Sequence, residues 1–363
     1  MAKCLSEKGS NLISRDKDFR LLILTQKIDK NDDVLGFMHG WVSEFAKKFN
    51  EITVITLGVG EYDLPKNVKV LSLGKESSRS RIKYIFKFYK YIWQERKNYD
   101  AVFVHMNREY MILGGWLWKI WRKKTIFWYN HKRGNLMSLL AGFFANKICY
   151  TSPYSFFARK KWNKAKKMSA GIDTERFKKM PEVKKIKNSI LCLGRISKVK
   201  NVDVLIDVAK MLDNEGYDFI IDIYGEGIES ESDYLPKLKE QAKLLINKGK
   251  VRFLGKISNT DAPKIFNQYE LYVNLTNSGS YDKTILEAMA CELSVIVSNR
   301  SFEGVLLDSS IFKEKDARDL AKKTLVFMKD KNIQNKEMLR TYVIQDQSLK
   351  KLLSGLKEYY EIS

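Results

Sequence analysis

The feature that most constrains this chain is an alternation of short apolar runs with longer amphipathic segments, which occurs twice along the sequence. In the first half, apolar runs at 19–26, 52–57, 101–106 and 125–131 alternate with helical patterns such as 36–49. Short runs that are apolar throughout are typical of strands covered on both faces, as in a parallel sheet. The alternation of such strands with helices predicts an α/β domain.

The same pattern restarts after a basic, loop-like stretch at 164–188. The second series of apolar runs lies at 189–196, 218–227, 251–255, 270–276 and 294–297. A chain of 363 residues is too long for one ordinary core, so we expect domains at 1–170 and 171–345, followed by a helical segment at 346–363. Two open parallel sheets in tandem predict a ligand in the cleft between them, at the carboxyl ends of the strands.

The net charge of +22 is divided unequally between the two halves. Residues 1–170 contain 33 Lys and Arg against 14 Asp and Glu, whereas residues 171–363 contain 32 against 29. No acidic residue occurs between Tyr110 and Ile172. A half that is basic on its own is expected to face an anionic partner, and the candidates are phospholipid, nucleic acid and acidic polysaccharide.

The cysteines and the apolar windows bear on location. The four cysteines are scattered and lack the spacing of a disulfide framework or a zinc site, which fits a reducing cytosol. Residues 1–19 are polar and contain no secretory signal pattern. The apolar windows at 110–121 and 136–150 are short and interrupted by lysine, whereas a bilayer span needs about 20 residues. We therefore expect a cytoplasmic protein without a transmembrane segment.

The motif GRISKVKN, at 194–201, follows the first strand of the second domain. Gly194 allows a tight turn, and Arg195 and Lys200 are close enough to reach one cleft. A guanidinium fork and an ammonium point charge together suit a diphosphate, although two basic residues near a turn are also what a solvated loop contains. Gly225 and Gly227, in YGEG, follow the next strand and either let backbone approach a ligand or simply make a turn.

The segment SGSYDKTILEAMACELSVIVSN, at 278–299, predicts a helix followed by a strand. The helix begins near Asp282, with Ser280 or Asp282 as its cap, and its free N–H groups would attract an anion, to which Lys283 adds charge. Apolar neighbours surround Glu287, so we expect a partly buried, hydrogen-bonded carboxylate that accepts bonds from a vicinal diol such as ribose. The alternative is a capped surface helix with an exposed Glu287.

The chain contains three histidines, and two of them follow predicted strands of the first sheet. His105 ends the run at 101–106 and His131 ends the run at 125–131. A single histidine at a strand end is usually structural, but two on parallel strands at the same edge favour a place on the rim of the cleft.

Five motifs in order carry a family resemblance: GIDTERF at 171–177, GRISKVKNVDVLI at 194–206, YGEG at 224–227, VRFLGKIS at 251–258 and LEAMACELSVIVSN at 286–299. Together they resemble the retaining glycosyltransferase family 4. That family has the GT-B fold, an α/β architecture of two Rossmann-like domains whose parallel sheets face across a cleft. Each motif alone is weak, but five in the same order are specific.

The resemblance implies roles for residues of the second domain. Arg195 and Lys200 match the basic pair that holds the donor diphosphate. Glu287 matches the carboxylate that binds the donor ribose. Thr284 and Ile285 match positions whose backbone N–H groups face the phosphate.

The resemblance also implies roles around the rest of the cleft. Gly36 matches a glycine that lets the first domain approach the donor, and His131 matches a histidine near the transferred sugar. Lys256 and Ile257 lie in a loop that matches the one beside the nucleotide base. The final helix, at about 347–361, resembles the segment that crosses back onto the first domain.

The chain departs from the family pattern at two positions. Gly279 stands where the family often has a glutamate, eight residues before Glu287, and Asn201 stands where glycine is usual. The Asp-Lys pair at 282–283 resembles a known variant of this helix start. From it we infer that Asp282 takes over the contact with sugar hydroxyls and that Lys283 lies near the phosphates.

Transfer from a nucleotide sugar needs positive charge where the leaving diphosphate develops its own charge. Arg195, Lys200 and the helix start at 282–285 would supply it, with His131 and Asp282 at the sugar. We therefore expect no metal and no resident cofactor. The DxD-like string at 16–18 precedes the first strand and reads as a polar tail. The first domain offers no obvious nucleophile of the kind that a retaining glycosidase uses, which fits the same-face attack that the family implies.

A predicted helix at 79–97 places basic residues in one narrow sector beside an apolar and aromatic arc. The basic sector contains Arg79, Lys83, Lys87, Lys90 and Lys97, and the arc contains Ile82, Ile85, Phe86, Tyr89, Ile92 and Trp93. This pattern suits a helix lying on anionic lipid, but also a helix that packs its arc on a sheet and leaves the basic face solvated. The stretch at 158–167 adds six basic residues and Trp162.

The main expectation is a retaining, metal-independent hexosyltransferase, peripheral on the inner face of the membrane. It would move a sugar from a UDP- or GDP-type donor to a lipid-linked or surface-polysaccharide acceptor. One alternative is a glycosyltransferase that modifies nucleic acid, because basic charge also binds nucleic-acid phosphate. The other is a non-catalytic GT-B-like binding protein, which Gly279 at the usual glutamate position suggests.

Overall fold

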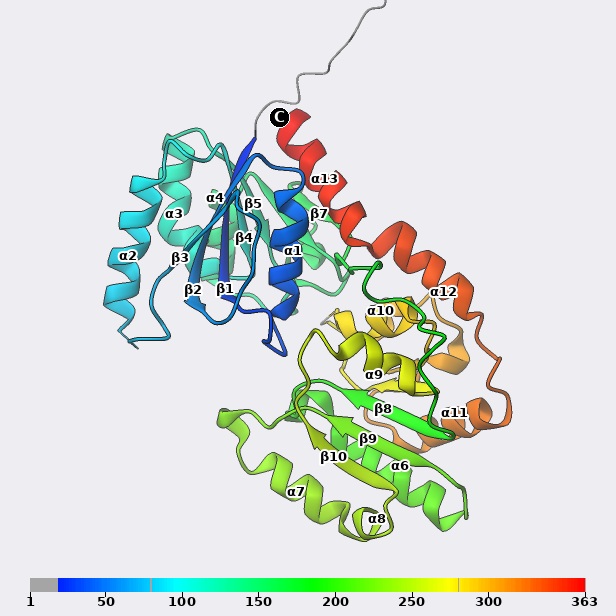
Figure 1. The fold of residues 1–363 in the computed structure, drawn as a ribbon. Helices are drawn as coiled ribbons and strands as arrows, with labels where there is room; N and C mark the ends of the chain where they lie inside the picture. The colour runs from blue at the N-terminus through cyan, green and yellow to red at the C-terminus, as the bar shows by residue number, and fades with distance from the viewer. Residues whose placement is uncertain (1–18, 79, 280, 363) are drawn as a thin grey trace, which may run out of the picture.

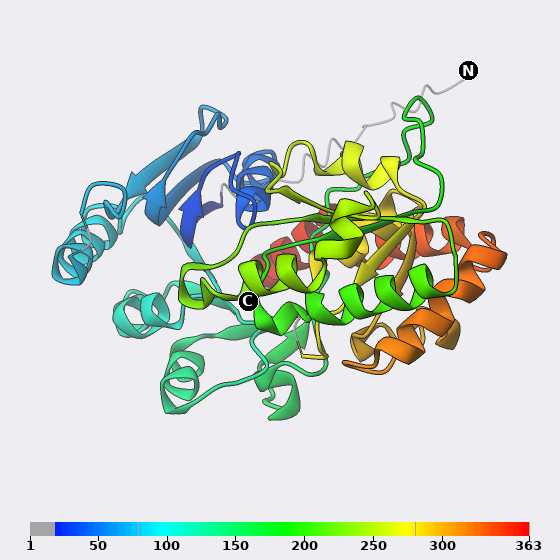
Figure 2. The same cartoon turned by 90° about the horizontal axis from the view of Figure 1, so that it is seen from below.

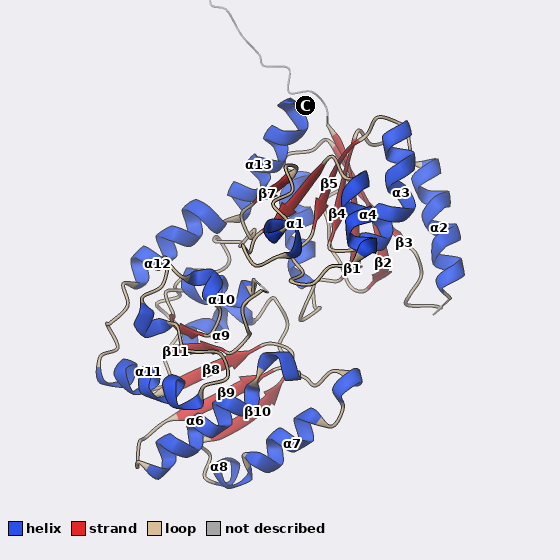
Figure 3. Ribbon diagram, turned by 180° about the vertical axis from the view of Figure 1, so that it is seen from behind, coloured by secondary structure: helices blue, strands red, loops and turns tan. Residues whose placement is uncertain are grey.

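The computed structural model describes residues 19–362, apart from Arg79 and Ser280. The DxD-like string at 16–18, the helix residue Arg79 and the candidate cap Ser280 therefore lie outside the described residues. Two α/β domains lie on either side of a cleft, and Figure 3 shows the two sheets with helices on their faces.

The N-terminal sheet has seven parallel strands in the order β3-β2-β1-β4-β5-β6-β7. The strands are β1 (Arg20–Ile28), β2 (Glu51–Val59), β3 (Val68–Ser72), β4 (Ala101–His105), β5 (Lys124–Trp128), β6 (Lys147–Tyr150) and β7 (Ala165–Lys167). The residues of β1 alternate between two buried clusters, one on each face of the sheet. This explains why the sequence of β1 is apolar at nearly every position.

Helices cover both faces of this sheet (Figure 1). One face packs against α1 (Gly36–Ala46) and the final helix α13 (Leu349–Ile362). The other face packs against α2 (Arg81–Gln94), α3 (Arg108–Ile120), α4 (Leu136–Phe144) and α5 (Phe156–Arg159).

The C-terminal sheet has five parallel strands in the order β10-β9-β8-β11-β12. Its strands are β8 (Ser189–Leu193), β9 (Ile220–Tyr224), β10 (Val251–Gly255), β11 (Leu271–Asn274) and β12 (Ser294–Val297). One face packs against α6 (Val202–Asn214), α7 (Tyr234–Gln241), α8 (Lys243–Asn247) and α11 (Ala317–Lys329). The other face packs against α9 (Ala262–Gln268), α10 (Lys283–Ala290) and α12 (Lys336–Tyr342).

The chain crosses between the domains twice, and the two crossings bond to each other. The amide of Ile172 donates to the carbonyl of Gln347 at 2.8 Å, and the amide of Leu349 donates to the carbonyl of Ile172 at 2.7 Å. After the second crossing, α13 packs on the N-terminal sheet, where the Tyr360 hydroxyl donates to the carbonyl of Val102 at 2.9 Å. The final helix thus ties the C-terminal end of the chain to the first domain.

The structure differs from the sequence-based expectations in several elements. The stretch at 164–188, expected as a loop, begins with the edge strand β7, whose Lys166 and Lys167 side chains are exposed and so look loop-like in sequence. The apolar window at 136–150, considered from its sequence only as a membrane span, contains α4 and β6. The helix expected at 79–97 is shorter, at Arg81–Gln94. In the part of the chain that the structure describes, every helix is too short or too polar to cross a membrane.

Candidate active site

A cavity of about 980 Å³ lies between the two domains. Its walls come from the carboxyl ends of strands in both sheets, which is where open α/β sheets bind ligands. The described lining residues from the first domain are Asp33, Val34, Leu35, Phe37, His105, Met106, Trp128, Asn130, His131, Lys132 and Arg133. Those from the second domain include Gly194, Arg195, Lys198, Lys200, Gly225, Lys256, Ile257, Gly279, Asp282, Lys283, Thr284, Glu287 and Lys315.

Two glycines let the turns after β8 and β9 approach each other. Gly225 has a φ of +144°, and a Cβ at this position would lie 1.9 Å from the carbonyl oxygen of Gly194. Gly194 has a φ of +150°, with its amide donating to the carbonyl of Tyr224 at 3.0 Å. A side chain at 225 would therefore separate the two turns that form this wall of the cavity.

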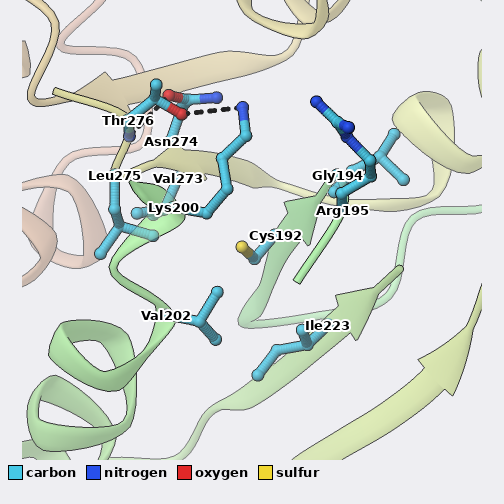
Figure 4. A pocket seen from close by; sticks show the side chains of 11 residues that line it. Cys192, Gly194, Arg195, Lys200, Val202, Ile223, Val273, Asn274, Leu275 and Thr276 are labelled. Atoms are coloured by element: carbon cyan, nitrogen blue, oxygen red, sulfur yellow. Dashed lines mark hydrogen bonds between the residues drawn. The ribbon is translucent and has the colours of Figure 1, made fainter. Parts of the chain in front are cut away.

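Arg195 and Lys200 both line the cavity but differ in their bonding. In Figure 4, their side chains extend in the same direction from the turn after β8. Arg195 is exposed and has neither a hydrogen bond nor an ion pair among the residues that the structure describes. Lys200 is bonded within the protein: its Nζ lies 2.5 Å from Oδ2 of Asp282 and 3.0 Å from Oγ1 of Thr276. Arg195 is thus a free cation and Lys200 a held one.

Asp282 stands at the N-cap position of α10, as one of the two expected caps, but its side chain makes no capping bond. Its Oδ2 atom instead accepts bonds from Lys200, from Thr276 Oγ1 at 2.6 Å and from Asn274 Nδ2 at 3.0 Å. Burial raises the pKa of Asp282, but the Lys200 charge and these hydrogen bonds outweigh it, so the pKa lies below its ordinary value. Oδ1 has no hydrogen bond within the described part of the chain, and Asp282 is one of the residues that line the cavity.

Lys283, expected near the donor phosphates, lines the cavity, and its ammonium lies against aromatic rings of the first domain. Nζ lies 3.4 Å from the ring centroid of Phe37 and 3.9 Å from that of Trp41, both on α1. This buried nitrogen has no hydrogen-bond partner among the described residues. Burial lowers the pKa of Lys283 well below its usual value, against the opposing charge of Glu287. The contact joins α10 to α1 across the cleft.

Glu287 lies one turn further along α10, and the sequence-based expectation of burial is confirmed. The residue is 6% exposed, but its carboxylate accepts no hydrogen bond from the described part of the protein, contrary to the expectation of a bonded group. Burial raises the pKa of Glu287 to about 7, although the charges of Lys283 and Arg176 act in the opposite direction. The carboxylate thus reaches the cavity with its acceptor sites unused.

The first turn of α10 offers fewer free N–H groups than expected. The amide of Ile285 lies 3.3 Å from the carbonyl of Asp282, and the Ile285 side chain is fully buried and lies outside the cavity lining. Thr284 does line the cavity, and its hydroxyl accepts a bond from Tyr272 at 2.7 Å. Of this pair, Thr284 therefore lines the cavity and Ile285 does not.

The two histidines lie where the sequence placed them, on the first-domain side of the cavity. His131 is exposed to the cleft, and desolvation by the surrounding protein, with the charge of Arg108, lowers its pKa. His105 is buried between Phe37 and Trp41, and burial lowers its pKa to about 3, helped by the charges of Lys283 and His131. Both imidazoles are therefore neutral near pH 7.

Two predicted glycines do not line the cavity. Gly36 opens α1, and a Cβ there would lie 2.8 Å from Cβ of Asn259, on the loop after β10. Figure 2 shows the start of α1 beside that loop. Gly36 therefore permits a domain–domain contact, and Gly227 lies near Leu235 of α7. Lys256 and Ile257 do line the cavity, with Lys256 at 4.0 Å from Glu226.

Sequence reasoning missed two features of the site. Lys132 reaches from the first domain to Gly279, where its Nζ donates to the carbonyl of Ser278 at 2.8 Å. Asn201 has a φ of +47°, a left-handed conformation that Gly and Asn adopt most readily. Its side-chain amide, through Nδ2, donates to the carbonyl of Leu275 at 2.9 Å. Its place in the sequence, where the family has glycine, was the available signal.

Groups of three or more His, Cys, Asp or Glu side chains that could hold a metal ion do not occur within 19–362, leaving aside Arg79 and Ser280. The DxD-like string at 16–18 lies outside that range.

Comparisons with known proteins agree with this architecture. Residues 173–345 match the family described as Glycosyl transferases group 1, which confirms the resemblance read from the sequence. Mannosylfructose-phosphate synthase of Agrobacterium fabrum is 31% identical over 112 residues, which cover 30% of this chain and 25% of that protein. This chain therefore matches about a quarter of the length of that curated relative.

Solved structures of low sequence identity share the fold over nearly the whole chain. HepE of Anabaena, solved in complex with UDP-glucose, superposes with a TM-score of 0.77 at 15% identity and covers 95% of this chain and 100% of its own. WaaG, a glycosyltransferase involved in lipopolysaccharide biosynthesis, has a TM-score of 0.66 at 15% identity, with 94% and 99% covered. The predicted GT-B fold, with parallel sheets facing across a cleft, is thereby confirmed.

Proposed function

We propose that this chain carries out a retaining, metal-independent transfer of a hexose-type sugar, a proposal supported by the match of residues 173–345 to Glycosyl transferases group 1. The donor is a nucleotide diphosphate sugar, and the acceptor is lipid-linked or a surface polysaccharide at the membrane. The observation that carries the proposal is the free guanidinium of Arg195 beside the anchored Lys200, at the carboxyl ends of β8 and β11.

In this proposal the donor diphosphate lies against Arg195 and Lys200. Departure of the diphosphate concentrates negative charge on its oxygens, and cations held in place beforehand stabilise that charge without reorganising. Asp282 and Thr276 fix the position of the Lys200 ammonium, and the turns at Gly194 and Gly225 hold the backbone beneath it. No step then requires a metal ion or a resident cofactor.

The other polar side chains of the cavity are proposed to bind the ribose and the transferred sugar. The unbonded carboxylate of Glu287 is suited to accept bonds from the two ribose hydroxyls. Asp282, with its unbonded Oδ1, and the neutral His131 also line the cavity, and in this proposal they contact sugar hydroxyls next to the diphosphate. Asp33 is the one acid among the described lining residues of the first domain, so we propose that the acceptor itself attacks on the face that the diphosphate leaves.

The donor class draws on the relatives. HepE was solved with UDP and with UDP-glucose, which supports a UDP-sugar for this cleft, and GDP-sugars are the alternative. The loop at Lys256 and Ile257 lines one end of the cavity and would lie beside the base.

A membrane-bound acceptor is supported by the outer surface of the first domain. Large apolar side chains of α2, α3 and α4 are exposed there: Ile82, Phe86, Trp93, Trp116, Ile120, Leu136, Met137 and Phe143. In Figures 1 and 3, α2 and α3 lie side by side, and the Trp93 and Trp121 rings are 5.8 Å apart. Lysines of this surface, such as Lys119 over the Phe143 ring at 4.6 Å, would meet anionic headgroups while the aromatic rings enter the interface.

The predicted arc of α2 is divided between the core and this surface. Ile92 of the arc is buried against the sheet, as is Phe88 outside the arc, whereas Phe86 is 73% and Ile82 68% exposed. The apolar surface favours lipid over nucleic acid as the anionic partner, because nucleic-acid sites combine cations with polar contacts to phosphate. We name the face formed by the exposed residues of α2, α3 and α4 the outer apolar face.

The test is transfer or hydrolysis of UDP- and GDP-sugars by the full chain, with and without EDTA. We expect turnover that EDTA leaves unchanged and that Lys200→Ala and Glu287→Ala each abolish. Full activity in both variants would exclude this site assignment. Donor binding without any turnover would instead support the non-catalytic alternative, and the anomeric configuration of the product, read by NMR, decides retention.

A further inference from the structure

Two further cations of the first domain line the cleft, one of them beside Gly279, and the diphosphate site leaves both unused. Lys132 and Arg133 follow His131 on the loop after β5, and both line the cavity. Nζ of Lys132 donates to the carbonyl of Ser278 at 2.8 Å, so this side chain spans from the first domain to the loop between β11 and α10. It lies across the cleft wall next to the start of α10.

Gly279 and Lys132 fit each other. Gly279 has a φ of +118°, and a Cβ there would lie 2.3 Å from Cδ and 2.7 Å from Cγ of Lys132. Because a side chain would also approach Cβ of Lys132 to 2.9 Å, rotation of the lysine tip alone does not relieve the clash. Any residue with a side chain at 279 would therefore displace Lys132 as well as strain the backbone. Lys132 of the first domain thus occupies the space that a side chain at position 279, where the family often has glutamate, would need.

The charges in the cavity exceed what a diphosphate requires. Among the described side chains that line it, eight are lysine or arginine and three are acidic. Two of these acids already face a lysine, Asp282 through its bond to Lys200 and Glu287 beside Lys283. A nucleotide diphosphate sugar brings one charge on each phosphate, and the six lysine and arginine side chains that the second domain contributes to the lining exceed its two acids by enough to balance both. Lys132 and Arg133 then have no counter-ion among the described residues.

We propose that Lys132 and Arg133 form a second anion subsite, which binds a carboxylate or phosphate group of the substrate beyond the donor diphosphate. The inference rests on the proposed function. After its bond to Ser278, the Lys132 ammonium has two N–H groups left, and the Arg133 fork can bind an oxyanion through two bonds. Arg159 donates to the carbonyl of Lys132 at 3.0 Å and so holds this loop in place.

Two sources can supply the anionic group. The donor sugar can carry a carboxylate, as a uronic acid does, or the acceptor can carry a phosphate that enters the cleft from the first-domain side. Both place an oxyanion on the same two side chains, so the subsite is tested first and its source second.

The experiment measures binding by calorimetry to the full chain and to Lys132→Gln, which removes the charge and keeps a donor for Ser278. The probes are UDP, UDP-glucose and UDP-glucuronic acid, then inorganic phosphate in the presence of saturating UDP; GDP, GDP-mannose and GDP-mannuronic acid replace them if the protein prefers guanosine. If the sugar carries the anion, we expect the variant to lose about tenfold or more in affinity for the uronic-acid donor relative to the neutral one. If the acceptor carries it, the two donors respond alike, and the phosphate binding seen with wild-type protein is lost in the variant.

Lys132→Arg keeps the charge and is expected to retain the wild-type response, which separates a charge effect from damage to the loop. Lys239→Gln, on the exposed surface of α7, removes one charge outside the cavity and is expected to change nothing. The proposal is overturned if Lys132→Gln alters neither the ratio between the two donors nor the response to phosphate. Failure of the wild-type protein to bind any UDP or GDP species would instead count against the proposed function itself.

Discussion

The ammonium of Lys200 lies 2.5 Å from Oδ2 of Asp282 and joins the turn after β8 to the start of α10. The two side chains are only 21% and 15% exposed, so each depends on the other for the balance of its charge. Asp282, at the start of α10, therefore holds the Lys200 ammonium in place at the wall of the cavity.

Removing either partner alone is expected to destabilise the protein, because it leaves a largely buried charge unpaired. Lys200→Met and Asp282→Asn should each lower the free energy of unfolding by about 3 kcal/mol. The double variant should lose clearly less than the sum of the two, because it removes both charges together. Urea unfolding of the four proteins measures the coupling, and additive losses would show that the pair is not energetically linked.

Arg195 should contribute to ligand binding and not to the stability of the fold, because it is exposed and has no bond within the described chain. Arg195→Ala is expected to change the free energy of unfolding by less than about 0.5 kcal/mol. It should weaken UDP binding by about 10- to 100-fold, the worth of a hydrogen bond to a charged group. Calorimetry with UDP measures the loss, and Arg318→Ala on the exposed surface of α11 is the matched control. Unchanged UDP affinity would remove Arg195 from the diphosphate site.

Asn201 links backbone conformation to the site. Its left-handed φ of +47° suits Gly and Asn, and its amide also donates to Leu275 and, at 3.0 Å, to Oδ1 of Asn277. Asn201→Gly keeps the conformation and loses the bonds, so we expect a loss of about 1 kcal/mol in unfolding free energy. Asn201→Ala adds strain and should cost about 1–2 kcal/mol more. Urea unfolding compares them, and equal losses would contradict the role of the left-handed turn.

The sequence predicted most strands of the two parallel sheets and the helices between them, because fully buried parallel strands are apolar at nearly every position. It missed the edge strand β7, whose exposed lysines resemble a loop, although it predicted β10 and β12 at the edges of the other sheet. Arg195, Lys200 and Glu287 were placed in the cleft by local motifs and the family resemblance. The sequence did not predict the contact of Lys132 with Gly279 or that of Lys283 with the Phe37 ring. Both contacts join residues that are distant in sequence and depend on how the domains meet.

The outer apolar face gives a prediction for membrane binding. Phe86→Glu and Phe143→Glu each replace an exposed aromatic ring with a charge of the wrong sign for an anionic surface. We expect each to lower the fraction of protein that floats with vesicles of phosphatidylcholine and phosphatidylglycerol, by about tenfold in partition coefficient. Leu244→Glu, at an equally exposed leucine of α8 in the other domain, should float like the wild type. Equal flotation of all four proteins would exclude this face, and retention of DNA across a salt series would favour the nucleic-acid alternative.

Glu287 gives a prediction for pH, because burial raises its pKa from the ordinary 4.5 to about 7. Between these values the native state keeps a proton that the unfolded chain has released, so stability from this group is present at low pH and is lost as the pH rises through about 7. Lys283, Arg176 and Asp282 face the same carboxyl group, and the lowered pKa of Lys283 acts in the opposite direction, with its effect extending above that window.

Glu287→Gln removes this titration while keeping the shape of the side chain. We expect the variant to gain stability relative to the wild type as the pH rises from 5 to 7.5, by about 2 kcal/mol over the range. Guanidinium unfolding at several pH values measures the difference, with the exposed Glu182→Gln as a control that should show no trend. Added UDP should reduce the gain, because the ribose hydroxyls would stabilise the ionised carboxylate of the wild type and offer the amide less. A difference between Glu287→Gln and wild type that stays constant with pH would contradict the raised pKa.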